Sequence, residues 1–266
     1  MFLVLGAVIA GVRLPRAPRI TAASGRTEPR AADSGSGLRL VVRDRSMVMF
    51  CVLGFVMFFA CYGQFESGLS AFAVEVTRIS PAMLGIALAA NTAVIVLAQF
   101  VVLRLVERRR RSRVIAAVGL VWTAAWLVAG VSGLVPGHHL AAVAAIISTY
   151  ALFGLGEAML APTVSPLVAD LAPDRMVGQY NSAFALVKQL ALAMGPAVGG
   201  LIVGAGAYGT YILMLVVASL AVSVTALRLG RRLTAAQDSP LRASLVVARS
   251  TPGVPAAESI PEGIPA

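Results

Sequence analysis

Glu66, Glu157 and Lys188 are ionisable residues that lie inside long apolar segments of this chain. A charge is costly in such a segment, and ionisable groups that persist there commonly serve a function. The carboxyl group of Glu157 can exchange a proton or contact a cationic compound. Alternatively, it supports a helix end by pairing with a nearby arginine. The sequence leaves both interpretations of Glu157 open.

Gln64 and Glu66 lie in the segment 62–68 (YGQFESG), which has two glycines and three polar residues. Irregular backbone inside a membrane is tolerated where it faces protein or water. This composition therefore predicts a local break in a helix that lines water. Glu66 can also simply reach the membrane interface, so Gln64 is the better candidate for a pathway.

Asn91 and Gln99 are eight residues apart in one apolar segment, which places them on the same face of a helix. They either line a cavity or form hydrogen bonds to a neighbouring helix. Lys188 lies within two turns of the start of a span that we expect to begin at Ala183. A lysine at that depth can extend its ammonium group to the interface.

The segment 195–200 (GPAVGG) is the most specific local pattern in the chain. A proline removes one backbone hydrogen bond, and glycines four residues apart allow close helix contact. We therefore predict a helix-bending element formed by Gly195, Pro196, Gly199 and Gly200. A static packing surface of small residues is the alternative.

Other kinds of site lack support in the sequence. His138 and His139 are the two histidines, too few for the usual metal ligand set. Cys51 and Cys61 are ten residues apart on one predicted helix, roughly 15 Å along its axis, which is too far for a disulfide. We find no catalytic triad and no phosphate-binding loop. The sequence therefore predicts no enzyme, no metal and no cofactor.

The elements that position these residues are apolar helices. The chain is 58% hydrophobic and 13% charged, with a mean hydropathy of +0.85, whereas a soluble domain has roughly 25% charged residues. Six stretches are long enough to cross a bilayer. They cover residues 47–72, 81–106, 114–135, 140–167, 183–205 and 208–229. The composition predicts an all-α integral membrane protein with a bundle of six transmembrane helices.

The net charge of +10 comes from arginines that flank these spans. Such residues orient spans and contact anionic lipid headgroups, so no nucleic-acid partner is expected. They cluster in alternate connections, which predicts that the central loop and the C-terminal tail are cytoplasmic. We expect a remnant of a preceding transmembrane helix at 1–12, a cytoplasmic loop at 13–45, the bundle at 46–230 and a disordered tail at 231–266.

Three short motifs resemble one family. They are 156–162 (GEAMLAP), 171–180 (LAP followed by GQY) and 195–200 (GPAVGG). Together they resemble the tenth and eleventh helices of major facilitator superfamily transporters, and most closely those of bacterial drug:proton antiporters. The resemblance implies that the six spans are helices seven to twelve, one half of the two-bundle fold.

The chain departs from the family pattern in its loops. The signature G-x-x-x-D-[RK]-x-G-[RK]-[RK] would fall on residues 103–112, where Glu107 replaces the aspartate and Arg108 is kept, but both glycines are lost. Val177 and Gln179 replace the usual arginines around the loop glycine. The resemblance implies a gating role for Glu107, Arg108 and Arg175 in the cytoplasmic loops.

The resemblance implies a secondary transporter at the cell membrane that exports small, partly hydrophobic molecules in exchange for protons. Pathway residues would be Gln64, Glu66, Asn91, Gln99 and Glu157. Expected partners are membrane lipids, a small-molecule substrate, protons and either a separately encoded N-terminal half or a second copy of the chain. The alternative is a non-transporting six-helix membrane protein, a truncated paralogue that binds a partner or lipid.

Overall fold

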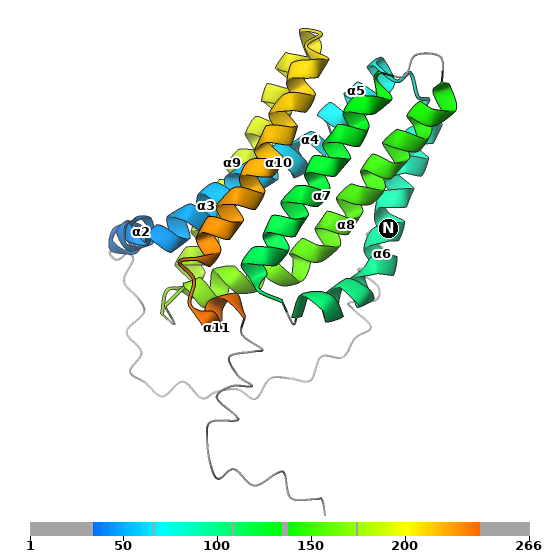
Figure 1. Cartoon of the computed structure of the whole chain (residues 1–266). Helices are drawn as coiled ribbons and strands as arrows, with labels where there is room; N and C mark the ends of the chain where they lie inside the picture. Colours follow the sequence, from blue (N-terminus) through cyan, green and yellow to red (C-terminus); the bar gives the residue numbers. More distant parts are fainter. Residues whose placement is uncertain (1–33, 66, 108, 135–137, 174, 240–266) are drawn as a thin grey trace, which may run out of the picture. The chain divides into compact units, whose positions relative to one another are not determined.

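The computed structural model describes residues 34–65, 67–107, 109–134, 138–173 and 175–239, and within these ranges it contains helices and no strand (Figure 1). The expected remnant at 1–12 lies outside the described residues. The helices are α2 (Ser34–Arg43), α3 (Arg45–Met57), a π-helical turn (Phe58–Tyr62), α4 (Gly63–Phe65), α5 (Gly68–Glu75), α6 (Pro81–Glu107), α7 (Arg111–Ser132), α8 (His139–Leu171), α9 (Val177–Gly204), α10 (Tyr208–Gly230) and α11 (Ala235–Asp238).

Six helical stretches are long and apolar enough to cross a membrane, which confirms the predicted bundle. They are α6 to α10 and the composite first span Arg45–Glu75. Helices satisfy their own backbone hydrogen bonds, which is why a chain this apolar folds into them in lipid. The largest difference from the prediction is at α9, which begins at Val177 rather than at Ala183.

The first span is interrupted, as the glycines and polar residues at 62–68 predicted. After α3 the helix widens into the π-helical turn Phe58–Tyr62, and α4 ends at Phe65 before α5 begins at Gly68. The hydroxyl of Ser67 donates to the carbonyl of Gly63 (2.8 Å) and satisfies one backbone acceptor at this break. The break therefore lies inside the bundle, where protein groups replace the missing helical bonds.

The spans pack around an aromatic core. Helix α8 lies between α6 and α7, and α10 packs along α7 (Figure 1). Trp122, Trp126 and Phe153 are buried where α7 meets α8, with ring centroids of the two tryptophans 5.9 and 5.0 Å from that of Phe153. Tyr211 of α10 meets Trp126 edge-on at 6.1 Å. Helix α9 packs instead on α3, the π-helical turn and α4.

The two ends of the bundle differ in charge. Exposed arginines gather where α6 joins α7 and where α8 and α10 end, and we call this the basic end. They include Arg109, Arg110, Arg113, Arg175, Arg228, Arg231 and Arg232. The opposite end holds the connections 76–80 and 205–207 and the end of α7 at 132–134. Among these, Gly206 has φ +71°, which a residue without a side chain adopts freely, and it closes the short turn from α9 to α10.

Two segments differ from the predicted domain boundaries. The predicted loop 13–45 carries α2 from Ser34, and Asp44 caps α3 by accepting from the backbone N–H of Ser46 (2.9 Å). The predicted disordered tail begins with a folded part, because α11 forms at Ala235–Asp238. Tertiary contacts order this part, and the local composition carried no sign of them.

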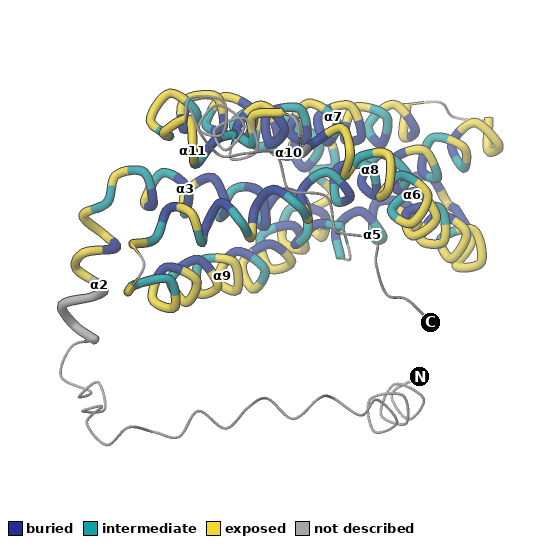
Figure 2. The backbone as a smooth tube through the Cα atoms, turned by 90° about the horizontal axis from the view of Figure 1, so that it is seen from below, coloured by how far each residue is buried: buried dark blue, intermediate teal, exposed yellow. Residues whose placement is uncertain are grey.

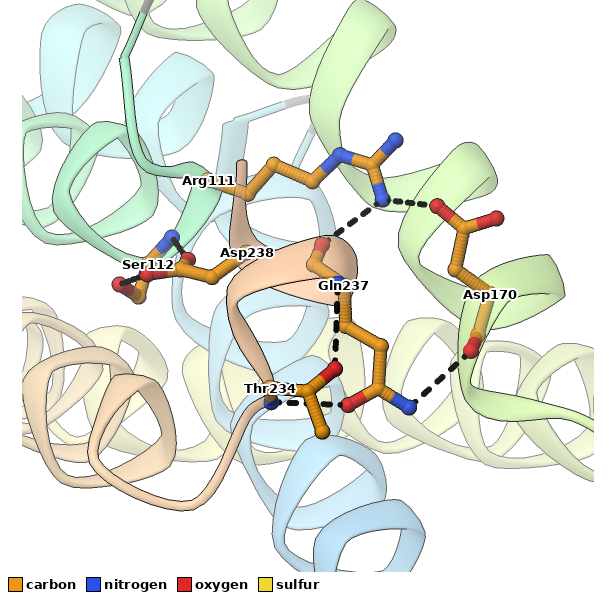
Figure 3. A network of polar contacts seen from close by, with 6 residues as sticks. All are labelled: Arg111, Ser112, Asp170, Thr234, Gln237 and Asp238. Atoms are coloured by element: carbon orange, nitrogen blue, oxygen red, sulfur yellow. Dashed lines mark hydrogen bonds and ion pairs between the residues drawn. The ribbon is translucent and has the colours of Figure 1, made fainter. Parts of the chain in front are cut away.

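These contacts form a clamp at the basic end, shown in Figure 3. The carboxylate of Asp238 accepts from the backbone N–H of Ser112 (2.8 Å) and from its hydroxyl (3.0 Å), although 126 residues separate them. Asp238 thereby caps the start of α7 from a distant part of the chain. Arg111 forms an ion pair with Asp170 at the end of α8 and donates to the carbonyl of Gln237 (3.1 Å). The clamp joins α7, α8 and the segment after α10.

We expect Asp238→Ala to release this clamp. The substitution leaves a buried N–H and hydroxyl of Ser112 without an acceptor, which costs roughly 1–3 kcal/mol. Hydrogen–deuterium exchange should then speed up at residues 233–239 and at the first turn of α7. Arg232→Ala is the control, because Arg232 is exposed and makes no side-chain hydrogen bond or ion pair in the described part of the chain. Equal exchange in both variants would contradict this role.

Candidate functional site

Gln64 connects the interrupted span to α9. Its side chain is fully buried, and its amide Nε2 donates to the backbone carbonyl of Gly195 at 2.6 Å. The other amide atom, Oε1, has no hydrogen-bond partner among the described residues. Gln64 was predicted to line a pathway. In this structure it holds α4 against α9, and its place on a pathway stays a prediction.

The glycines of the predicted bending element make this contact possible. A Cβ on Gly195 would stand 2.9 Å from the Cα of Gly63, so the two backbones touch. A Cβ on Gly199 would collide with Oε1 of Gln64. Pro196 and Gly200 are exposed on the other side of α9, and α9 runs unbroken through the proline. Gly195 and Gly199 are thus a packing surface, and bending at Pro196 remains a prediction.

Glu157 lies near the middle of its span. Helix α8 runs from His139 to Leu171, so Glu157 is about one half-turn past its midpoint. Its side chain is half-buried and lies close enough to Cys61 and Tyr62 of the π-helical turn to interact with them electrostatically. The interpretation of Glu157 as a support for a helix end does not match this mid-span position.

Lys188 lies deeper in its span than the sequence predicted. Because α9 begins at Val177, Lys188 lies about three turns into the helix instead of near its end. Its ammonium nitrogen stands over the ring of Phe58, 5.0 Å from the centroid, at the distance of a cation–π interaction. The sequence did contain a sign that the helix begins early, since the segment from Val177 to Ala183 has no helix-breaking residue after Gly178.

Phe58, Tyr62, Glu157 and Lys188 form what we call the aromatic–ionic cluster. The rings of Phe58 and Tyr62 are 5.1 Å apart, and Lys188 and Glu157 approach them from α9 and α8. Trp122 meets Tyr62 edge-on at 6.0 Å and fixes that ring from α7. A carboxylate, an ammonium group and the partly exposed ring of Tyr62 at mid-span can together exchange a proton and hold a partly hydrophobic molecule.

The other predicted site residues that the structure describes are not brought to this cluster. Asn91 is buried and donates to the carbonyl of Tyr150 (3.2 Å), so it joins α6 to α8. Gln99 is exposed on α6. Glu66 and Arg108 lie outside the described residues. Glu107 is the last residue of α6, and Arg175 is exposed ahead of α9.

Metal chemistry has no site in the part of the chain that the structure describes. No group of three or more His, Cys, Asp or Glu side chains there could hold a metal ion.

Comparison with known families agrees with this architecture. A family model described as the Major Facilitator Superfamily matches residues 68–257, well over half of the chain. The chain belongs to the major facilitator superfamily. No individual curated protein matches it.

A major facilitator protein is a membrane transporter, and the six spans described here correspond to one half of that fold. In this superfamily two bundles enclose the path of the substrate between them. The residues with transport chemistry are therefore sought on the side of the bundle that a second bundle would cover.

We predict that Gly199→Ala and Gly200→Ala have opposite effects. The added methyl group at position 199 displaces the Gln64 amide and breaks its bond to Gly195, which should cost roughly 1–3 kcal/mol. At position 200 it meets nothing within 4 Å, and alanine favours the helix by up to about 1 kcal/mol. Thermal unfolding of the purified protein measures both. Equal melting temperatures would refute the packing role of Gly199.

Proposed function

We propose that this major facilitator protein exports small, partly hydrophobic molecules in exchange for protons, and that Glu157 carries the proton. The observation that supports this most directly is the position of Glu157 at mid-span, half-buried beside Tyr62. An ionised carboxylate is costly at that depth unless it is paired or hydrated. Protonation removes the charge and with it that cost. Whether Glu157 holds a proton therefore depends on whether water reaches its carboxyl group.

The surroundings of Glu157 favour a neutral or weakly cationic substrate. Phe58 is buried, and the partly exposed ring of Tyr62 offers a face that attracts cations. Lys188 already stands over Phe58, so a cationic substrate would have to displace it or bind nearer to Glu157. In this mechanism the proton and the substrate compete for the carboxylate. Alternating access would then carry them in opposite directions.

Gln64 acts in this proposal as a positioning residue. Its bond to the Gly195 carbonyl holds α4, and with it the preceding π-helical turn, against α9. We further propose that the basic end faces the cytoplasm, which agrees with the excess of arginine expected in cytoplasmic loops. The gating role of Glu107, Arg108 and Arg175 is likewise a proposal.

Glu157→Gln should abolish proton-driven efflux while leaving expression and melting temperature near those of the parent protein. The amide keeps the shape of the side chain but cannot take up a proton. Efflux of a fluorescent lipophilic cation from membrane vesicles, driven by an imposed proton gradient, measures this. Glu157→Asp keeps the carboxyl group and should retain part of the activity. Unchanged efflux by the glutamine variant would remove Glu157 from the mechanism.

The proposal also requires a second bundle against α6 and α9. Only 17% of the most apolar stretch of α6 and 22% of that of α9 is buried, against 56% for α7, and Figure 2 shows the exposed surface along both helices. The exposed side of α9 carries polar side chains that lipid does not solvate. They are Gln179, Asn181, Ser182, Lys188 and Gln189.

The exposed residues of α10 have a different character. Its exposed large hydrophobic residues are Leu213, Val217, Leu220, Val224 and Leu227. Such a face suits lipid, whereas that of α9 suits protein. The second bundle is either an N-terminal half or another copy of this chain.

A photoreactive amino acid at position 189 should therefore cross-link a second six-helix bundle in native membranes. The same group at position 220 should capture lipid, because Leu220 lies on the apolar face of α10. Mass spectrometry identifies the captured species. Lipid at both positions would mean that the bundle stands alone, which would favour the non-transporting alternative.

A further inference from the structure

A cavity on the α7–α10 side of the bundle is lined by residues outside the aromatic–ionic cluster. It is a groove of about 500 Å³ at the opposite end, bounded by the end of the first span, by α7 and by α10. Its volume is typical of small-molecule sites. Leu127, Val131 and Leu213 line it and are 51–63% exposed, so the groove opens to the surroundings of the bundle.

Three glycines shape this groove. A Cβ on Gly130 would stand 3.0 Å from Ile212, and one on Gly133 would stand 3.0 Å from Val76, so α7 approaches its neighbours closely at these points. A Cβ on Gly209 would meet nothing within 4 Å. Gly209 therefore leaves open the space that a larger residue would fill.

The lining determines what can occupy the groove. Apart from the hydroxyl of Tyr208, it is made of hydrocarbon side chains, aromatic rings and glycines. It extends from Tyr208, the first residue of α10, to Val216, which is about 12 Å further along the helix axis. A slot that starts at the membrane interface and runs this far into the core matches the upper part of a lipid acyl chain.

Charged groups of both signs lie at the interfacial rim. The hydroxyl of Tyr208 donates to the exposed carboxylate of Glu75 (3.0 Å). Arg78 is exposed, lies within electrostatic reach of the Tyr208 hydroxyl and has no ion pair in the described part of the chain. Its backbone is held at φ +55°, a conformation that is uncommon for a residue with a side chain.

We propose that this groove binds one phospholipid with a zwitterionic ammonium headgroup, such as phosphatidylethanolamine. One acyl chain fills the apolar slot beside Gly209. The lipid phosphate contacts the guanidinium of Arg78, and the ammonium group contacts the carboxylate of Glu75. A guanidinium–phosphate contact is a charge-assisted hydrogen bond, while a primary ammonium can donate to a carboxylate in the same way.

Native mass spectrometry of the purified protein tests this, with equal amounts of phosphatidylethanolamine, phosphatidylcholine and phosphatidylglycerol supplied in mixed micelles. We expect one retained phosphatidylethanolamine. Gly209→Leu should abolish its retention by filling the slot. Gly204→Leu is the matched control, because Gly204 is also exposed with nothing within 4 Å of an added Cβ, and it is absent from the groove lining.

Arg78→Gln separates headgroup recognition from the slot, since it leaves the apolar lining intact. It should weaken retention about tenfold, the effect of losing roughly 1.4 kcal/mol of a charge-assisted contact. Equal retention of all three lipids, or a preference for phosphatidylglycerol, would overturn the proposed headgroup contacts. Retention that survives Gly209→Leu would overturn the site, and so would displacement of the lipid by a transported compound. None of these outcomes depends on the activity of Glu157.

Discussion

The bond from the Gln64 amide to the Gly195 carbonyl connects the interrupted first span to α9. That span carries a π-helical turn and a break within a few residues, so its own backbone hydrogen bonds leave it poorly determined. Contact with α9 supplies the missing constraint, and the glycines at 63, 195 and 199 bring the two backbones together. Phe58 and Tyr62 lie directly before this contact. Their position relative to Glu157 and Lys188 therefore depends on it.

The clamp at the basic end also depends on hydrogen bonds from side chains to the backbone of another element. There, too, a side chain from one element satisfies backbone groups of another, since Asp238 caps α7 and Gln237 donates to the carbonyl of Asp170 (3.1 Å). Both contacts join segments that are more than 60 residues apart. Such bonds hold elements in register because the alternative is an unsatisfied buried polar group.

Hydropathy and arginine spacing were enough to predict the number of spans and nearly all of their ends. These features follow from local composition, because each span must separately match the thickness of a bilayer. Local composition did not reveal that Asp238 meets Ser112, since that contact depends on how α7 and α10 pack. It also misplaced Lys188, because the polar residues 179–182 suggested a loop where α9 has already begun. Asn91 and Gln99 share a helix face by spacing, yet the neighbouring α8 buries only the first.

The π-helical turn at Phe58–Tyr62 has a consequence for comparing this chain with its relatives. A regular helix turns about 100° per residue, and a π-helical turn accommodates one extra residue within a span. Loss of a single residue here would restore a regular helix and leave the span's ends almost in place. If α3 (Arg45–Met57) kept its place, the residues after the turn would rotate by about 100°, and Gln64 would no longer face Gly195. An ungapped alignment across this turn would therefore equate residues that face different neighbours, so relatives should be compared separately on its two sides.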